Sequence, residues 1–215
     1  MIYLVAGPGR TGSTWLSDII KDQLGVDQVL CPVSSEDPAR LTHALTLPPD
    51  DPAHLTARLD DPIAVVHTHD KLFIEKYGIS PENVFLIISR RRNTFEWILS
   101  NYIAMHTKEY GNYSNKEVEP FKMDFRRFQG KYLYRENWYN NFNFNLPYFN
   151  TATIYYEDMV NATSNKALLQ DIISSPTEYP REYSYGKCPY NYKKWVSNWE
   201  ELYVWYQAWE SQRFI

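Results

Sequence analysis

A glycine-rich loop close to Met1 constrains this chain more than any other feature. The apolar run from Ile2 to Ala6 predicts a buried strand, and the loop Gly7-Pro-Gly-Arg-Thr-Gly12 follows it directly. After the loop, apolar residues recur at helical spacing, namely Trp15, Leu16, Ile19, Ile20 and Leu24. In a strand–loop–helix unit of this kind, backbone N–H groups and the helix N-terminus point to one spot, which attracts phosphate.

The loop partly matches the nucleoside-triphosphate P-loop, G-x-x-x-x-G-K-S/T. Gly7, Gly12 and Thr14 fit this pattern, but Ser13 stands where the lysine should be. That lysine neutralises the β- and γ-phosphates in kinases and ATPases, so its absence argues against phosphoryl transfer. A cation is still present at Arg10, which predicts a phosphate site with a different layout of charge. The alternative is a tight turn that binds no ligand.

Length and composition limit the class of protein. With 215 residues, of which 44% are hydrophobic and 22% charged, we expect one globular domain covering residues 1–215. The net charge of −4 makes nucleic acid an unexpected partner and requires any anion site to be a local cluster. Cys31 and Cys188 are far apart and lack zinc-ligand spacing, so no metal site or disulfide framework is predicted.

Two further observations bear on location. No apolar run approaches the roughly 18 residues that a membrane span needs. Met1 stands immediately before the first predicted strand, which leaves no room for a signal peptide. We therefore expect a cytoplasmic protein without a membrane span, while the oligomeric state stays open.

Strands and helices alternate along the chain. Besides the first, four segments predict strands: Val29–Val33, Ile63–Val66, Val84–Ile88 and Ala152–Tyr156. Helical patterns cover residues 14–24, 72–77, 94–103, 121–139, 166–173 and 195–214, and residues 34–62 read as loops around a helical piece at 53–59. This order predicts an α/β protein, a P-loop-like three-layer fold with a largely parallel central sheet flanked by helices.

Ligands of such sheets bind at the C-terminal ends of the strands. Three segments rich in polar residues fall there: Gly7–Ser13, His67–Asp70 and Ser89–Asn93. Asn93 suits the N-cap of the next helix, and Glu96 is placed to reach back to it. A strand, a basic turn and a capped helix make a second arrangement suited to anions, with a solvated basic turn as the alternative.

In combination, four segments resemble the sulfotransferases that use 3′-phosphoadenosine-5′-phosphosulfate (PAPS). Gly9–Trp15 resembles the family's P-K-S-G-T-T-W loop, which holds the 5′-phosphosulfate, and Val66–His69 resembles its K-T-H, which carries the catalytic base. Arg92-Asn93 with Ser100 is similar to its R-D/N-x₆-S, which binds the 3′-phosphate. Tyr155–Met159 is similar to its Y-E-D-M/L, whose tyrosine lies near the adenine. The four matches occur in the family's order within residues 4–159.

The resemblance implies transfer of a sulfuryl group from PAPS to a hydroxyl or amine of a small-molecule or glycan acceptor. The product nucleotide would be 3′,5′-ADP, and no metal is needed. His69 becomes the expected general base, because the pKa of histidine lies near working pH. His67, on the same face of the strand, is the second candidate. The alternative for His69 is a strand-end residue that only forms local hydrogen bonds.

The first loop would bind the 5′-phosphosulfate. Arg10 stands where the family has lysine, and an arginine stabilises the departing phosphate as a bidentate donor but cannot act as an acid. Ser13 and Thr14 could add hydrogen bonds or cap the helix. The residues that the resemblance assigns to this part of the site are Gly9, Arg10, Thr11, Gly12, Ser13 and Thr14.

The remaining assignments concern the nucleoside end. Arg92 and Ser100 are expected to bind the 3′-phosphate, with Arg90 as the alternative to Arg92. Tyr156 either contacts adenine or belongs to the core. The family's C-terminal R-K-G-x-x-G loop is not recognisable; Gly186-Lys187 and Lys193-Lys194 are the candidates for its role. Four tryptophans at helical spacing indicate packing, Trp195, Trp199, Trp205 and Trp209.

Two rival interpretations remain open at this point. A small-molecule or nucleotide kinase needs an acidic residue for Mg²⁺, and Asp70 after the second long strand is the plausible one. The other rival is a catalytically inactive nucleotide-binding protein of the same fold, which the exchange of lysine for Arg10 keeps possible.

Overall fold

The computed structural model describes residues 1–32, 45–47, 62–70, 72–107, 119–141, 150–178 and 192–212. The helical piece expected at 53–59 and the candidate Gly186-Lys187 lie outside these ranges. The chain groups into two compact units, Met1–Arg92 with Trp138–Ser184 and Asn93–Asn137 with Tyr185–Ile215. A single domain over residues 1–215 stays a prediction.

The first unit is built on a parallel sheet. Among the described residues it has six strands in the order β3-β2-β4-β1-β5-β6, and neighbouring strands run parallel. The strands are β1 (Ile2–Ala6), β2 (Val29–Pro32), β3 (Leu45–Leu47), β4 (Ala64–Thr68), β5 (Val84–Arg90) and β6 (Asn150–Tyr155). The predicted α/β fold with a largely parallel central sheet is confirmed.

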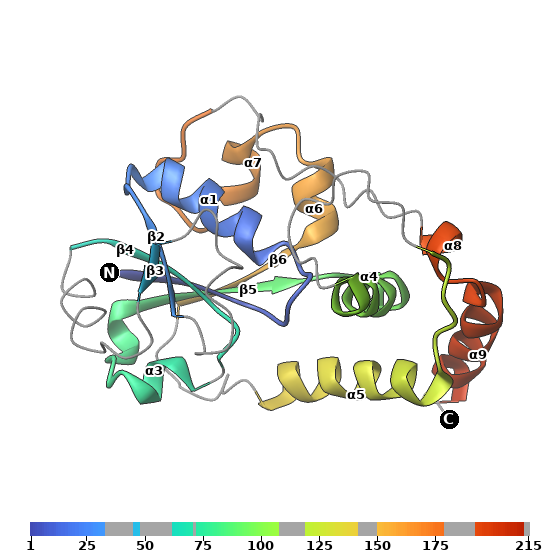
Figure 1. Ribbon diagram of the computed structural model, residues 1–215. Helices are drawn as coiled ribbons and strands as arrows, with labels where there is room; N and C mark the ends of the chain where they lie inside the picture. Colours follow the sequence, from blue (N-terminus) through green and yellow to red (C-terminus); the bar gives the residue numbers. More distant parts are fainter. Residues whose placement is uncertain are drawn as a thin grey trace. The chain divides into compact units, whose positions relative to one another are not determined.

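Helices cover both faces of this sheet. In Figure 1, α1 (Ser13–Leu24), α6 (Tyr156–Asn161) and α7 (Asn165–Leu169) lie on one side, and α3 (Phe73–Lys76) lies on the other. A short 3₁₀ turn, η2 (Pro81–Asn83), leads into β5. The central strands are therefore buried on both faces, and all five residues of β4 are buried.

Two expectations about this unit were wrong. The stretch 34–62, predicted to contain loops and a helical piece, also contains strand β3, which pairs with β2. Tyr156, predicted to end a strand, is the first residue of α6, and the acidic Glu157 and Asp158 lie in the first turn of that helix. Acidic side chains there are favourable because the helix N-terminus carries partial positive charge.

The register of the central strands aligns their C-terminal ends. Strand β1 lies between β4 and β5, and Ala6 is opposite both Thr68 and Ile88. Residues that follow these three strands therefore meet at one edge of the sheet. The expectation that the segments after β1, β4 and β5 come together is confirmed.

The second unit is helical and aromatic. It holds α4 (Thr94–Thr107), α8 (Tyr192–Trp195), α9 (Trp199–Gln212) and most of α5 (Phe125–Asn141), whose last turn belongs to the first unit. Asn93 caps α4, because its Oδ1 accepts a hydrogen bond from the Glu96 backbone N–H at 3.0 Å. Asn198 joins the segment before α5 through two hydrogen bonds with the backbone of Met123.

The aromatic residues of this unit pack together as predicted. Trp195, Trp199, Trp205 and Trp209 are partly buried against a core that includes Phe95, Trp97 and Phe128. The predicted helices at 121–139 and 195–214 begin later, at Phe125 and Trp199. In the segments that precede these two helices, Phe121 forms an isolated parallel β-bridge with Val196.

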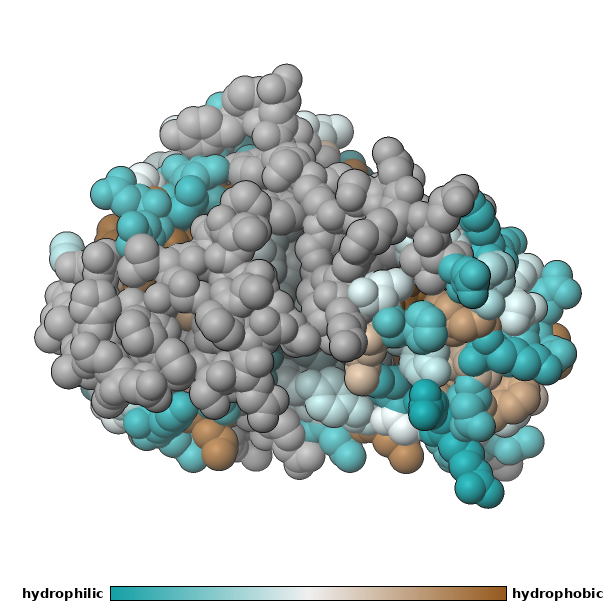
Figure 2. All heavy atoms as spheres, in the orientation of Figure 1, coloured by the Kyte–Doolittle hydropathy of each residue, from teal (hydrophilic) through white to brown (hydrophobic). Residues whose placement is uncertain are grey.

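Outside the cores, hydrophilic and hydrophobic residues are interspersed on the described surface that Figure 2 shows. Within the described ranges, no helix combines the length and the apolar character needed to cross a membrane.

Candidate active site

The loop between β1 and α1 has the backbone geometry of an anion-binding turn. Arg10 and Gly12 both adopt the left-handed conformation, with φ of 72° and 79°. Thr11 is fully buried, and its hydroxyl donates to the Pro8 carbonyl at 3.0 Å. Turns of this kind aim successive N–H groups to one side, where they form a concave site for an anion.

Helix α1 begins at the end of this loop. Gly12 occupies the N-cap position and no side chain caps the helix. Ser13 and Thr14 lie within the first turn, so neither takes the capping position that was one alternative for them. Thr14 is exposed, Ser13 is buried, and Gly9 and Arg10 are half-buried. The positive end of α1 thus lies at the point where the loop turns.

Two of the loop's glycines are required by close contacts. A Cβ on Gly7 would lie 2.8 Å from the backbone carbonyl oxygen of Ser89 and 2.8 Å from Thr11 Oγ1. A Cβ on Gly12 would lie 2.9 Å from the ring of Tyr156, in addition to the strain of its positive φ. The loop is therefore pressed against both β5 and α6.

His69 reaches the first residue of the loop. Its Nδ1 hydrogen-bonds the Gly7 carbonyl oxygen. Because a carbonyl oxygen only accepts, Nδ1 must carry the hydrogen, and Nε2 of the neutral ring keeps its lone pair. The Trp138 indole N–H donates to the His69 carbonyl at 3.2 Å and fixes the backbone there. This is the tautomer that a general base at Nε2 requires.

The surroundings of His69 favour the neutral form. Removal of water by surrounding protein atoms lowers the pKa of His69, and the hydrogen bond to Gly7 opposes that shift in part. The residue nevertheless keeps solvent-exposed surface, so this desolvation is incomplete. His69 is therefore both unprotonated near neutral pH and accessible, as the role of base demands.

His67 occupies a different environment. It is buried, with Nε2 2.8 Å from Ser13 Oγ and Nδ1 3.7 Å from Cys31 Sγ. Its ring meets the His69 ring edge to face, with centroids 4.8 Å apart. Burial, followed by the nearby His69, lowers the pKa of His67 well below its usual value. Both ring nitrogens of this second candidate base are already engaged with protein atoms.

The end of β5 supports the middle of the loop. Ser89 Oγ donates to the Thr11 carbonyl at 2.8 Å, and Tyr139 donates its hydroxyl to the Ser89 carbonyl at 3.1 Å. The Arg90 guanidinium lies over the Tyr139 ring, 4.3 Å from its centroid. Arg90 Nε is buried without a hydrogen-bond partner among the described residues, which fits a ligand that accepts hydrogen bonds.

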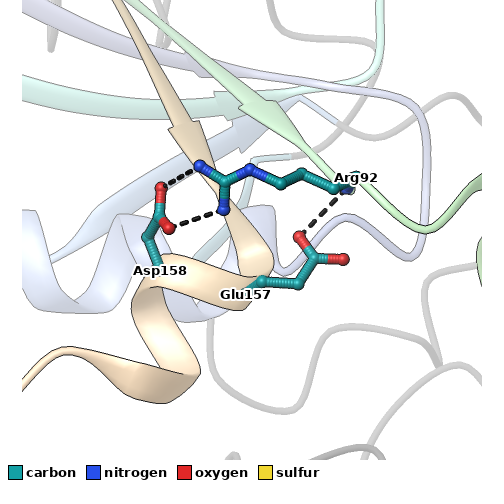
Figure 3. A network of polar contacts seen from close by, with 3 residues as sticks. All are labelled: Arg92, Glu157 and Asp158. Carbon is teal, nitrogen blue, oxygen red and sulfur yellow. Dashed lines mark hydrogen bonds and ion pairs between the residues drawn. The ribbon is translucent and has the colours of Figure 1, made fainter.

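Arg92 is paired within the protein (Figure 3). Its guanidinium makes a bidentate ion pair with Asp158, at 2.6 and 2.8 Å, and its backbone N–H donates to Glu157 at 3.0 Å. The guanidinium also lies over the Tyr155 ring at 4.0 Å. Both side chains of the ion pair are about half exposed, so an incoming anion can compete with the carboxylate.

Tyr156 lies beside the loop rather than on an open surface. Its ring packs edge to face with Trp15, with centroids 6.5 Å apart, and the Arg91 guanidinium lies 4.9 Å from the ring centroid. Trp15 belongs to the core, as its helical spacing predicts. Each arginine of the 90–92 turn thus lies over the ring of a different tyrosine.

Other predicted residues lie elsewhere. Ser100 is buried in α4 and belongs to the second unit, whereas the loop belongs to the first. The Asp70 carboxylate accepts the Leu72 backbone N–H at 3.0 Å and shapes the turn before α3. In the described parts of the chain, no three His, Cys, Asp or Glu residues are grouped so that they could hold a metal ion.

Sequence reasoning did not assign several residues that shape the site. Trp138 and Tyr139 lie on α5, far along the chain from the strands that they support, and no local pattern marks them. Cys31 in β2 and Ser89 near the end of β5 are polar residues in mostly apolar strands, a weak signal that becomes informative only once their neighbours are known.

Comparison with known proteins finds neither a family model nor a curated protein that matches this chain. The sulfotransferase resemblance therefore rests on the four sequence motifs.

Proposed function

We propose that the protein is a sulfotransferase, which moves a sulfuryl group from PAPS to a hydroxyl or amine of a small-molecule or glycan acceptor. The observation that carries this proposal is the hydrogen bond from His69 Nδ1 to the Gly7 carbonyl. It joins the candidate base to the first residue of the candidate phosphate loop and leaves the Nε2 lone pair as the proton acceptor.

The residues supply each part of such a reaction. His69 Nε2 takes the proton of the acceptor hydroxyl while the acceptor oxygen forms its bond to sulfur. The bond between sulfur and the 5′-phosphate oxygen breaks, and its electron pair stays on the phosphate, which leaves as 3′,5′-ADP. The loop N–H groups, the N-terminus of α1 and the Arg10 guanidinium stabilise that negative charge. A guanidinium does not serve as a general acid, so Arg10 acts through its charge and its N–H donors.

At the other end of the nucleotide, Arg92 would bind the 3′-phosphate and Tyr156 would contact adenine. Because Arg92 is paired with Asp158, the phosphate has to replace that carboxylate. Arg90, whose buried Nε has no described hydrogen-bond partner, remains the alternative ligand.

The rival proposals are a kinase and an inactive nucleotide-binding protein. Ser13, at the position of the P-loop lysine, is buried against His67, so it offers a hydroxyl where a kinase needs a cation. We keep the cytoplasm as the expected location of the enzyme.

Transfer of radiolabelled sulfate from PAPS tests the proposal. The acceptors should be a phenol, an aliphatic alcohol, an amine and a glycan, with wild-type protein and the His69→Ala variant. Removal of a general base is expected to lower the rate of transfer by about 10²–10⁴-fold. The matched control is His106→Ala, because His106 is an exposed histidine at the end of α4 in the second unit.

Three outcomes would change the assignment. Undiminished transfer by His69→Ala would remove His69 as the base. Tight binding of 3′,5′-ADP without transfer to any acceptor would favour the inactive nucleotide-binding protein. Consumption of ATP with Mg²⁺ in place of PAPS would favour the kinase.

A further inference from the structure

Three buried polar side chains from separate elements form a chain that ends at the phosphate loop. Cys31 on β2 contacts His67 Nδ1 at 3.7 Å, and His67 on β4 contacts Ser13 Oγ through Nε2 at 2.8 Å. Their exposed fractions are 8% for Cys31, 5% for His67 and 3% for Ser13. Ser13 is the first residue of α1, so the chain ends where an anion would bind.

The direction of these hydrogen bonds depends on one proton. A neutral imidazole carries hydrogen on one nitrogen only. If that nitrogen is Nδ1, it donates to Cys31 sulfur, and the Ser13 hydroxyl donates to Nε2. If it is Nε2, it donates to Ser13 Oγ, the thiol donates to Nδ1, and the Ser13 hydroxyl hydrogen is left for another acceptor.

A bound anion selects between the two arrangements. A phosphate oxygen only accepts, so a Ser13 hydroxyl that binds it must donate to it and cannot also donate to His67. The second arrangement then satisfies every group. Burial keeps the required donors in place, since it raises the pKa of the Cys31 thiol to about 11 and keeps His67 neutral by lowering its pKa.

We propose that Cys31 and His67 are positioning residues that turn the Ser13 hydroxyl toward the 5′-phosphate of the bound nucleotide. This inference rests on the proposed function, because it takes its ligand from it. In the bound protein the hydrogen bonds run from the Cys31 thiol to His67 Nδ1, from Nε2–H to Ser13 Oγ, and from the Ser13 hydroxyl to the phosphate. His67 and His69 then hold opposite tautomers although their rings are in contact.

The tautomers can be measured directly by ¹⁵N NMR of protein with labelled histidines, with and without saturating 3′,5′-ADP. The expected result in the bound protein is hydrogen on Nε2 of His67 and on Nδ1 of His69. The His67→Gln variant assigns the signals. Hydrogen on Nδ1 of His67 in the bound protein would overturn the proposed direction.

Affinity measurements test whether the chain of hydrogen bonds acts on the ligand. Cys31→Ala removes the thiol donor, whereas Cys31→Ser keeps a donor of similar size. We expect Cys31→Ala to weaken binding of 3′,5′-ADP by roughly three- to tenfold, as loss of part of a hydrogen bond to a charged group predicts. Cys31→Ser should stay within about twofold of wild type on the same scale.

A double-mutant cycle with Ser13→Ala separates positioning from general loss of structure. Without the Ser13 hydroxyl, Cys31→Ala should weaken 3′,5′-ADP binding no further, whereas a merely structural effect would add to that of Ser13→Ala. If Cys31→Ala weakens 3′,5′-ADP binding by the same factor with and without the Ser13 hydroxyl, the inference is overturned. If wild type does not bind 3′,5′-ADP, the proposed function fails and this inference with it; if it binds but the cycle is additive, the inference fails alone.

Discussion

Replacing Gly12 by alanine perturbs the loop between β1 and α1 at the point where it touches α6. The left-handed conformation costs an L-residue about 1–2 kcal/mol, and alanine recovers about 0.4–1 kcal/mol through a less flexible unfolded chain. The new Cβ would also lie 2.9 Å from the Tyr156 ring and 3.3 Å from Met159 Cε. Overpacking of that kind costs about 1–3 kcal/mol, so the total destabilisation should be about 1–5 kcal/mol, with about 3 kcal/mol as the central value.

Gly25 supplies the matched control, because it has φ of 65° and nothing lies within 4 Å of the Cβ that alanine would add there. Gly25→Ala should therefore lower the free energy of unfolding by only about 1 kcal/mol. For a chain of this size, 1 kcal/mol corresponds to roughly 2–4 °C in Tm. If Gly12→Ala lowers the free energy of unfolding by about 3 kcal/mol, it should lower Tm by roughly 6–12 °C, whereas Gly25→Ala should lower Tm by roughly 2–4 °C.

The assay is urea unfolding of both variants, together with Tyr156→Ala and the double variant Gly12→Ala/Tyr156→Ala. Because the Tyr156 ring causes the crowding, its removal should make the Gly12 substitution cheaper by about 1–3 kcal/mol in the double variant. Equal destabilisation by Gly12→Ala and Gly25→Ala, or strict additivity in the cycle, would refute the packing of Tyr156 on the loop.

Three further predictions concern charge. Because Arg10 has φ of 72°, a conformation that glycine adopts without strain, Arg10→Gly should leave Tm unchanged or slightly raised. Loss of the guanidinium should weaken 3′,5′-ADP binding at least about tenfold, as measured by calorimetry. A large fall in Tm would contradict this prediction. Asp158→Asn should release Arg92 and tighten 3′,5′-ADP binding by roughly three- to tenfold, whereas weaker binding would show that the carboxylate positions Arg92 for its ligand. Folding lowers the pKa values of His67 and His69, so below pH 6.5 the unfolded chain binds more protons than the folded protein, and the free energy of unfolding should fall as the pH is lowered from there. Urea unfolding at a series of pH values should show a smaller dependence of that free energy on pH for His67→Gln than for wild type. An unchanged dependence on pH would contradict this prediction.

The central strands could be predicted because each has a recognisable hydrophobic pattern in its own sequence. β1 is an apolar run throughout, and β4 and β5 begin with the apolar runs Ala64–Val66 and Val84–Ile88, as strands buried on both faces require. Strand β3 has only three residues in a stretch rich in proline and aspartate, and its partner β2 rather than its own pattern defines it. At Tyr156 a helix signal was present in Glu157 and Asp158, but the run of β-forming residues before it hid the boundary.

Some features of the candidate site could likewise be predicted from the sequence, and others could not. Parallel strands bring their C-terminal ends to one edge, so the placement of the loop and of the segments His67–Asp70 and Ser89–Asn93 at that edge could be predicted from the alternation of strands and helices. The pairing of Arg92 with Asp158 and the contacts of Trp138 and Tyr139 depend on three-dimensional distances between segments far apart in sequence. No spacing along the chain encodes them.

The most direct test of the account is thermal unfolding of the purified protein with 3′,5′-ADP, with 5′-AMP, and with ATP plus Mg²⁺. A ligand at about 100 times its Kd adds roughly 2.7 kcal/mol, which is about 5–11 °C in Tm for a chain of this size. The account predicts that shift with 3′,5′-ADP and little or none with 5′-AMP at the same concentration. A shift with ATP and Mg²⁺ alone, or with none of the three, would contradict it.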